Sequence, residues 1–173
     1  DYGDGIKDTL LNGNNHTHTY APWGNSSISL FVETNSGCQS PVKTQALYVN
    51  PIPVANFTMP AVVCLPFDSA RFINTSTIAD GTAAGLTSLW NFGDPPSGVN
   101  NTSSIKNPAH LYNNAGPFNV KLTITSAAGC VKDTTKILTT VYTRALASFN
   151  VNPEYCLNNI SSFASTSIGS GST

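Results

Sequence analysis

Cysteines, histidines and carboxylates are the side chains of this 173-residue chain that could bind a metal or carry out chemistry. His16 and His18 stand two residues apart, which places both on one face of a strand and would suit a metal ion, but no third ligand is evident nearby. Asp1, Asp4 and Asp8 superficially suggest a calcium loop, yet they lack the glycine and the glutamate of an EF-hand. We therefore predict no metal site, with weak calcium binding as the alternative.

Nucleophilic catalysis would need a serine or cysteine beside a histidine that an acid orients. The serines lie in expected loops without a G-x-S-x-G turn, and the four cysteines form a repeating set, which indicates a structural role. The sequence therefore predicts no catalytic residue, no cofactor and no enzyme.

The cysteines reveal an internal repeat. Cys38 and Cys130 are 92 residues apart in the sequence, and so are Cys64 and Cys156. Three further landmarks recur at nearly this period: His18-Thr19-Tyr20 with His110-Leu111-Tyr112, Gly24 with Gly116, and Tyr2-Gly3-Asp4 with Phe92-Gly93-Asp94.

The phase of this repeat predicts three parts. Residues 1–51 are expected to be the back part of one domain, residues 52–143 a complete domain, and residues 144–173 the front part of a third. The linkers between them are short, and the first is flanked by prolines, so we expect them to be stiff. We expect the chain to be a segment of a longer array.

Within the complete repeat the hydrophobic pattern has a period of two. Phe118, Val120, Leu122 and Ile124 alternate with polar residues, which predicts a strand with one buried face. About seven short strands per repeat predict an all-β chain of tandem immunoglobulin-like antiparallel β-sandwiches, with Trp90 in the core of the complete one. Further strands are expected within residues 55–58, 70–73, 88–91 and 136–138, and no segment has a convincing helical pattern.

The composition argues against two classes of partner. Charged residues make up 10% of the chain, the net charge is −1, and no cluster of Lys and Arg occurs, so no nucleic acid is expected. No apolar run approaches the length of a membrane-spanning helix, so no direct membrane insertion is expected. The opening residues lack the pattern of a signal peptide, which processing or truncation would have removed from a secreted protein.

Three stretches of the complete repeat resemble the polycystic-kidney-disease (PKD) domain family. Residues 89–94 read LWNFGD, residues 107–112 read NPAHLY, and residues 115–124 read AGPFNVKLTI. They are similar to the family's W-x-F-G-D-G, P-x-H-x-Y and G-x-Y-x-V-x-L-x-V motifs, which recur in part before residue 33. The resemblance implies PKD-type sandwiches over nearly the whole chain. Pro95 departs from the pattern, since the family has glycine there, and a longer loop follows it.

The Gly-Cys pair in the late hairpin, with a cysteine before the second strand, is similar to repeats of large Bacteroidetes surface proteins. That resemblance implies type IX secretion, an extracellular or cell-surface location, and a non-enzymatic stalk or adhesion module in cell attachment or surface filaments. The partners it implies are neighbouring repeats of the same protein, self-assembly into a filament, and a glycan or protein surface ligand. The main alternative is an accessory polysaccharide- or collagen-binding module of a secreted hydrolase. A third is an animal receptor ectodomain, which N-glycans at Asn56 or Asn74 would indicate.

An even number of cysteines in a secreted β domain predicts disulfides. We predict a bridge between Cys64 and Cys130, worth roughly 4 kcal/mol in the chain-entropy description, with Cys38 and Cys156 paired to cysteines outside the chain. The rival is a bridge between successive domains, because the first turn and the last hairpin of a simple sandwich lie at opposite ends. It would leave all four cysteines unpaired within the chain.

Several surface side chains are candidates for modification or contact. Thr9, Ser69 and Thr134 match the Asp-Ser/Thr-apolar (or Thr) pattern of Bacteroidetes O-glycosylation, and Thr9 and Thr134 are expected in or beside turns. Trp23 occupies a turn where the second copy has Ala115, so it is a candidate ligand contact or a cover for a neighbouring domain's end.

Two pairs of repeat-equivalent polar residues have expected structural roles. Asp4 and Asp94 should cap their turns through their own backbone. His18 and His110 are expected to make a hydrogen bond near the tyrosine that follows each of them two residues later.

Overall fold

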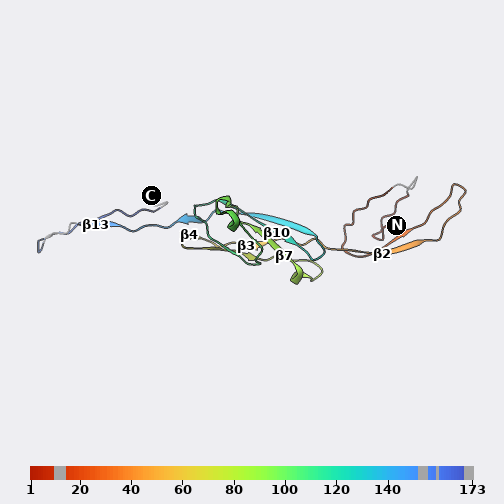
Figure 1. Cartoon of the computed structure of the whole chain (residues 1–173), viewed down its shortest axis with the longest axis horizontal. Coiled ribbons are helices and arrows are strands. Elements are labelled where there is room, and N and C mark those ends of the chain that lie inside the picture. The colour runs from red at the N-terminus through yellow and green to blue at the C-terminus, as the bar shows by residue number, and fades with distance from the viewer. Residues whose placement is uncertain (10–14, 152–155, 159, 170–173) are drawn as a thin grey trace.

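A computed structural model describes residues 1–9, 15–151, 156–158 and 160–169 of the chain. A central body lies between two flanks, with the N-terminal flank on the right of Figure 1 and the C-terminal flank on the left. The described residues form β-strands and only two short 3₁₀ helices, so the predicted all-β class is confirmed. Among these residues, no helix has the length and apolar content needed to cross a membrane.

The larger sheet of the central body is antiparallel, with strands in the order β11-β10-β7-β8. Its strands β10 and β11 form a hairpin that pairs Phe118 with Leu138 at one end and Thr125 with Val131 at the other. The four strands are β7 (Thr87–Asn91), β8 (Thr102–Ser103), β10 (Phe118–Thr125) and β11 (Val131–Leu138).

Three short strand pairs accompany this sheet. Two are antiparallel: β3 (Phe57–Thr58) with β6 (Ile73–Asn74), and β5 (Ala70–Arg71) with β9 (Ala109–His110). The third is parallel and joins β4 (Val63–Leu65) to β12 (Val141–Thr143). The helices are η1 (Ala83–Gly85) and η2 (Pro95–Asn101), the latter kinked at Gly98.

The core lies between the larger sheet and the short pairs. The four apolar residues of β10 are buried and their polar neighbours are not, as the period of two predicted. Trp90 on β7 is fully buried, packs edge-on against Phe57, and donates its indole N–H to the carbonyl of Ile105 at 3.0 Å. Burying so large a side chain with its one polar group satisfied stabilises the sandwich, and the prediction of a core tryptophan is confirmed.

The chain enters and leaves the central body at opposite ends, which we call the entry pole and the exit pole. At the entry pole, Asn50 and Pro51 line a small groove together with residues 126–128 of the β10–β11 turn. At the exit pole, β12 follows β11 and pairs with β4, where the N–H of Val63 donates to the carbonyl of Thr140. A module with this path can be strung end to end with others.

The two flanks are open structures. The N-terminal flank contains a hairpin of β1 (Gly24–Leu30) and β2 (Lys43–Val49), and the C-terminal flank a pair of β13 (Phe149–Val151) and β14 (Phe163–Ser165). None of the described residues before Pro51 or after Val141 is fully buried. The hydrophobic core therefore belongs to the central body, within the range predicted for the complete domain.

Candidate functional site

The most ordered polar feature of the central body is a buried cluster of Asp94, His110 and Tyr112, which we call the Asp–His–Tyr cluster. The Oδ2 atom of Asp94 lies 3.0 Å from Nε2 of His110, and both residues are 4% exposed. The His110 ring stacks on Phe92 with centroids 4.4 Å apart, and the Tyr112 hydroxyl donates to the Phe92 carbonyl at 2.9 Å. The cluster therefore ties the end of β7 to β9 and to the segment that follows it.

Gly93 makes this approach possible. Its φ is +70°, and a Cβ placed there would lie 2.5 Å from the carbonyl oxygen of Asn119 on β10. Only glycine combines that backbone angle with so close a contact. The motif glycine thus allows β7 to turn against β10, which brings Asp94 under His110.

The electrostatics of the cluster keep the Tyr112 hydroxyl protonated, as suits a structural hydrogen-bond donor. Burial, and secondly the negative charge of Asp94, raise the pKa of Tyr112 well above its usual range, so its hydroxyl stays protonated. The expectation that His110 makes a structural hydrogen bond near Tyr112 agrees with the geometry. Asp94 differs from the expectation, because its carboxylate bonds a histidine sixteen residues away in addition to standing in a turn.

The N-terminal flank carries the same cluster a second time. Asp4 Oδ2 lies 2.7 Å from His18 Nε2, and the Tyr20 hydroxyl donates to the Tyr2 carbonyl at 3.2 Å. The Tyr2 and His18 rings stack with centroids 3.9 Å apart. The hydrogen bond from His18 is the largest of the effects that lower the pKa of Asp4. The sequence repeat is therefore also a repeat of contacts.

The arrangement around His110 is not that of a nucleophile and its base. Ser97 lies nearby on η2, but its hydroxyl donates to the backbone carbonyl of Asp94 at 2.7 Å. A serine activated for attack would instead donate to the histidine. The geometry thus assigns Ser97 to the turn.

The candidate metal ligands are engaged with each other. His16 lies 2.6 Å from Asp8 Oδ2, and Asp1 and Asp4 accept backbone N–H groups of Gly3 and Ile6. Within the described part of the chain, no group of three or more histidine, cysteine or acidic side chains is arranged to hold a metal ion.

The predicted bridge between Cys64 and Cys130 is wrong for this structure. All four cysteines are unpaired, with Cys64 and Cys130 half-buried and Cys38 and Cys156 exposed. Cys64 lies on β4 at the exit pole, whereas Cys130 follows the β10–β11 turn at the entry pole. The eight-residue strand β11 separates them by about 24 Å at about 3.4 Å per residue, far beyond disulfide reach.

The surface candidates are accessible to different degrees. Thr9 and Ser69 are exposed, as modification would require. Thr134 is half-buried in the middle of β11, paired with Leu122, and not beside a turn as predicted. The expectation failed because the polar run from Asp133 to Lys136 resembles a turn although it forms the middle of the edge strand β11, where Thr134 faces the same side of the sheet as Leu122. Trp23 is 49% exposed just before β1.

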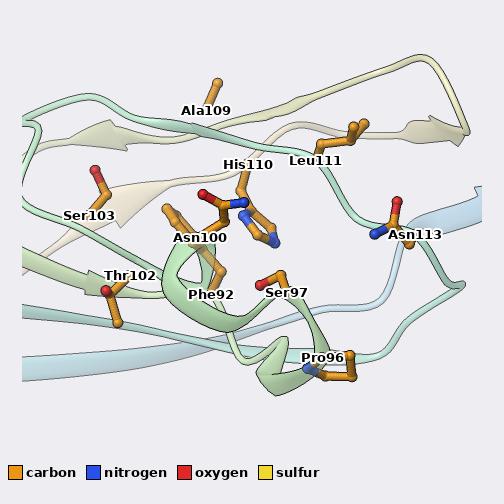
Figure 2. A pocket seen from close by; sticks show the side chains of 10 residues that line it. All are labelled: Phe92, Pro96, Ser97, Asn100, Thr102, Ser103, Ala109, His110, Leu111 and Asn113. Carbon is orange, nitrogen blue, oxygen red and sulfur yellow. The ribbon is translucent and has the colours of Figure 1, made fainter.

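Beside the Asp–His–Tyr cluster lies a cavity of about 540 Å³, which the sequence did not predict. Figure 2 shows Ser97 and Asn100 of the η2 segment facing His110 and Phe92, with Thr102 and Ser103 to one side. Pro96, Ser97 and Asn100, in the longer loop that follows Asp94, form one wall of the cavity. The lining residues are Phe92, Pro96, Ser97, Asn100, Thr102, Ser103, Ala109, His110, Leu111 and Asn113.

The fold and the cluster together define an immunoglobulin-like β-sandwich module. The turn after β7 is held in place by contacts among an aspartate, a histidine and a tyrosine. The PKD domain family matches residues 50–141, which is more than half of the chain, and the protein belongs to that family. PKD domains are generally non-catalytic modules and typically occur in extracellular or surface proteins.

A solved structure is also similar to this chain. The PKD1 domain of Vibrio anguillarum Epp is 30% identical, with a TM-score of 0.42, over 53% of this chain and 96% of that one.

Proposed function

We propose that this chain is a segment of a tandem array of PKD-type domains that serves as a non-enzymatic stalk and adhesion module of a cell-surface or secreted protein. In this array residues 52–143 are one complete unit, and residues 1–51 and 144–173 are parts of its neighbours. The bacterial surface adhesins and filaments that the repeat resembles are the setting we infer for it, with export by a type IX system.

The observation that carries the proposal is the second Asp–His–Tyr cluster in the N-terminal flank. Asp4, His18 and Tyr20 repeat both the polar contacts and the ring stacking of Asp94, His110 and Tyr112. The two clusters also share a glycine that closely approaches a neighbouring strand. A Cβ on Gly3 would lie 2.5 Å from the backbone of Ser27, and a Cβ on Gly93 would lie 2.5 Å from the backbone of Asn119. A chance recurrence would not reproduce this contact as well. This recurrence supports the assignment of the flank as the back part of a domain of the same kind.

The positions of the two poles support a role of the array as an elongated spacer. Because the chain enters the central body at one pole and leaves at the other, each added unit would lengthen the array rather than fold back on it. Few residues separate the last paired strand of one unit from the first of the next, and a short linker with proline is stiff. A stiff series of units projects a distal binding surface away from the cell.

Small-angle X-ray scattering tests the array directly. We would compare the 173-residue chain with a chain in which residues 52–143 occur twice in succession. The proposal predicts that the maximum dimension grows by one full domain length and that the duplicated chain stays elongated. A duplicated chain whose maximum dimension hardly changes, because its two domains pack side by side, would overturn it.

The cavity beside η2 supports a second candidate, an accessory module that binds a polysaccharide. Its wall is lined by hydroxyl and amide groups, including Ser97, Asn100 and Asn113, together with the Phe92 ring and no acidic or lysine side chain. Such a lining suits a neutral, hydroxyl-rich ligand. Retention on insoluble cellulose or chitin that is lost in Asn100→Ala but not in Asn158→Ala would favour this function, and absence of retention would count against it.

A further inference from the structure

We infer that disulfides join successive repeats of this array, each linking Cys64 at the exit pole of one repeat to the Cys130 position at the entry pole of the next. The inference rests on the proposed array and adds a covalent bond to it. It accounts for cysteines that recur at two fixed positions in every repeat and yet find no partner within one domain.

The first step is the position of the two cysteines relative to the junction. Cys64 is paired with Tyr142 across β4 and β12, so it lies at the point where the chain leaves the domain. The N–H of Cys130 donates to Ser126 Oγ at 3.1 Å, which holds it in the turn beside the point where the chain enters. When domains are stacked end to end, these two positions face each other across each junction.

The second step uses the one junction that the structure contains. Asn50 is the position 92 residues before Tyr142, and the structure supports this equivalence, because Gly24 pairs with Val49 as Gly116 contacts Val141. In the preceding repeat, the residue equivalent to Cys64 would therefore pair with Asn50, about 4.8 Å away across a ladder.

Asn50 in turn lines the entry-pole groove together with Ser126, Ala127 and Ala128, the turn that leads into Cys130. The cysteine of the preceding repeat would thus stand one strand spacing from a residue that already shares a groove with this turn. A disulfide needs Cα atoms about 4.4–6.8 Å apart, a separation that a small adjustment of the turn can supply.

The third step is the surface of the two poles. Apolar side chains stand exposed around the exit pole, with Val62 57%, Phe67 77% and Tyr142 49% exposed. Ile52 and Val54 are 65% and 61% exposed near the entry pole. A junction that covers these residues would exclude water around the two thiols and hold them together.

The chemistry is a two-electron oxidation by a disulfide-form oxidant such as glutathione disulfide. The thiolate of one cysteine attacks the oxidant's S–S bond, which forms a mixed disulfide and releases one glutathione thiolate. The facing cysteine thiolate then attacks the protein sulfur of that mixed disulfide and releases the second glutathione. Two protein thiols thus lose two protons and two electrons, and the oxidant is reduced to two thiols.

The test uses the chain with residues 52–143 duplicated, which contains one whole junction. After equilibration with reduced and oxidised glutathione, free thiols are alkylated and the unreduced protein is mapped by peptide mass spectrometry. The expected result is a peptide of the first copy that contains Cys64 linked to a peptide of the second copy that contains Cys130. The copies are distinguished by complementary single-cysteine variants.

Matched variants separate the inference from accidental oxidation. Cys64→Ser in the first copy should abolish the linked peptide, whereas Cys64→Ser in the second copy should leave it, because that cysteine stands at the free pole. A bond within one copy would overturn the inference, and so would fully alkylated thiols in a chain that scattering shows to be stacked end to end. A duplicated chain that does not stack end to end would overturn the proposed array and the disulfide together. Failure of the disulfide alone would instead show as free thiols in a chain that does stack, so the two failures are distinguishable.

Discussion

The side chains of Asp94 and His110 pair beneath the surface, with 3.0 Å between Oδ2 and Nε2. Replacing Asp94 by alanine leaves the imidazole buried without its acceptor, which should lower the free energy of unfolding by about 2–3 kcal/mol. Urea titration followed by Trp90 fluorescence measures this loss. The matched control is Asp4→Ala, which removes the same contact in the open flank and should leave the midpoint of the central body unchanged. Equal losses in both variants would contradict the assignment of the core to one domain.

The raised pKa of Tyr112 makes the free energy of unfolding depend on pH in the alkaline range. Its pKa is raised in the folded protein, so above about pH 10 the unfolded chain releases this proton while the folded one still holds it. Stability is therefore complete below that pH and falls as the pH rises further. Tyr112→Phe should cost about 1 kcal/mol near neutral pH, through the lost bond to Phe92, and should flatten the alkaline decline. An unchanged alkaline slope in the variant would show that another group causes it.

At the scale of the elements, the closest approach in the sandwich is that of the turn after β7 to β10. Gly93→Ala adds a Cβ that would lie 2.5 Å from the Asn119 carbonyl oxygen, and it also places alanine at an unfavourable φ of +70°. We therefore expect the free energy of unfolding to fall by at least about 3 kcal/mol, or the chain to fail to fold. Gly98→Ala is the control, since its φ is also positive but the space around it is open, and it should cost only about 1 kcal/mol. Thermal unfolding followed by circular dichroism compares the two, and similar costs would contradict a role for the close contact.

The sequence predicted the elements to the extent that their residues carry a local pattern. β10 was predictable because Phe118 to Ile124 alternate strictly, and the burial of Trp90 because immunoglobulin-like sandwiches bury a strand tryptophan in their core. Among the short strands, β3 and β5 lie within the predicted ranges 55–58 and 70–73, whereas β9 was not predicted, because two residues are too few to define a period.

The candidate site was predictable only in part. His110 and its bond near Tyr112 followed from the repeat, but the partner Asp94 did not, because an insertion of unpredictable path separates the two residues. The recurrence of both Asp and His in each repeat was the available signal for that pairing. The bridge from Cys64 to Cys130 failed because the two cysteines stand at opposite poles, which is the topology on which the rival, a bridge between successive domains, was based.

At the scale of the whole molecule, we propose one complete domain between parts of two others. Every buried apolar side chain of the described residues lies from Pro51 to Val141, so the protein should unfold with one cooperative transition. The flanking pairs β1–β2 and β13–β14 are two-stranded sheets without a covering layer, and such hairpins are marginal in water.

Amide hydrogen exchange on the intact 173-residue chain tests this central claim most directly. We expect slow exchange confined to the central body, with the amides of β7, β10 and β11 protected to the level of global unfolding. We expect fast exchange in β1, β2, β13 and β14. Protection of these flanking strands equal to that of β10, in a chain shown to be monomeric, would contradict this claim.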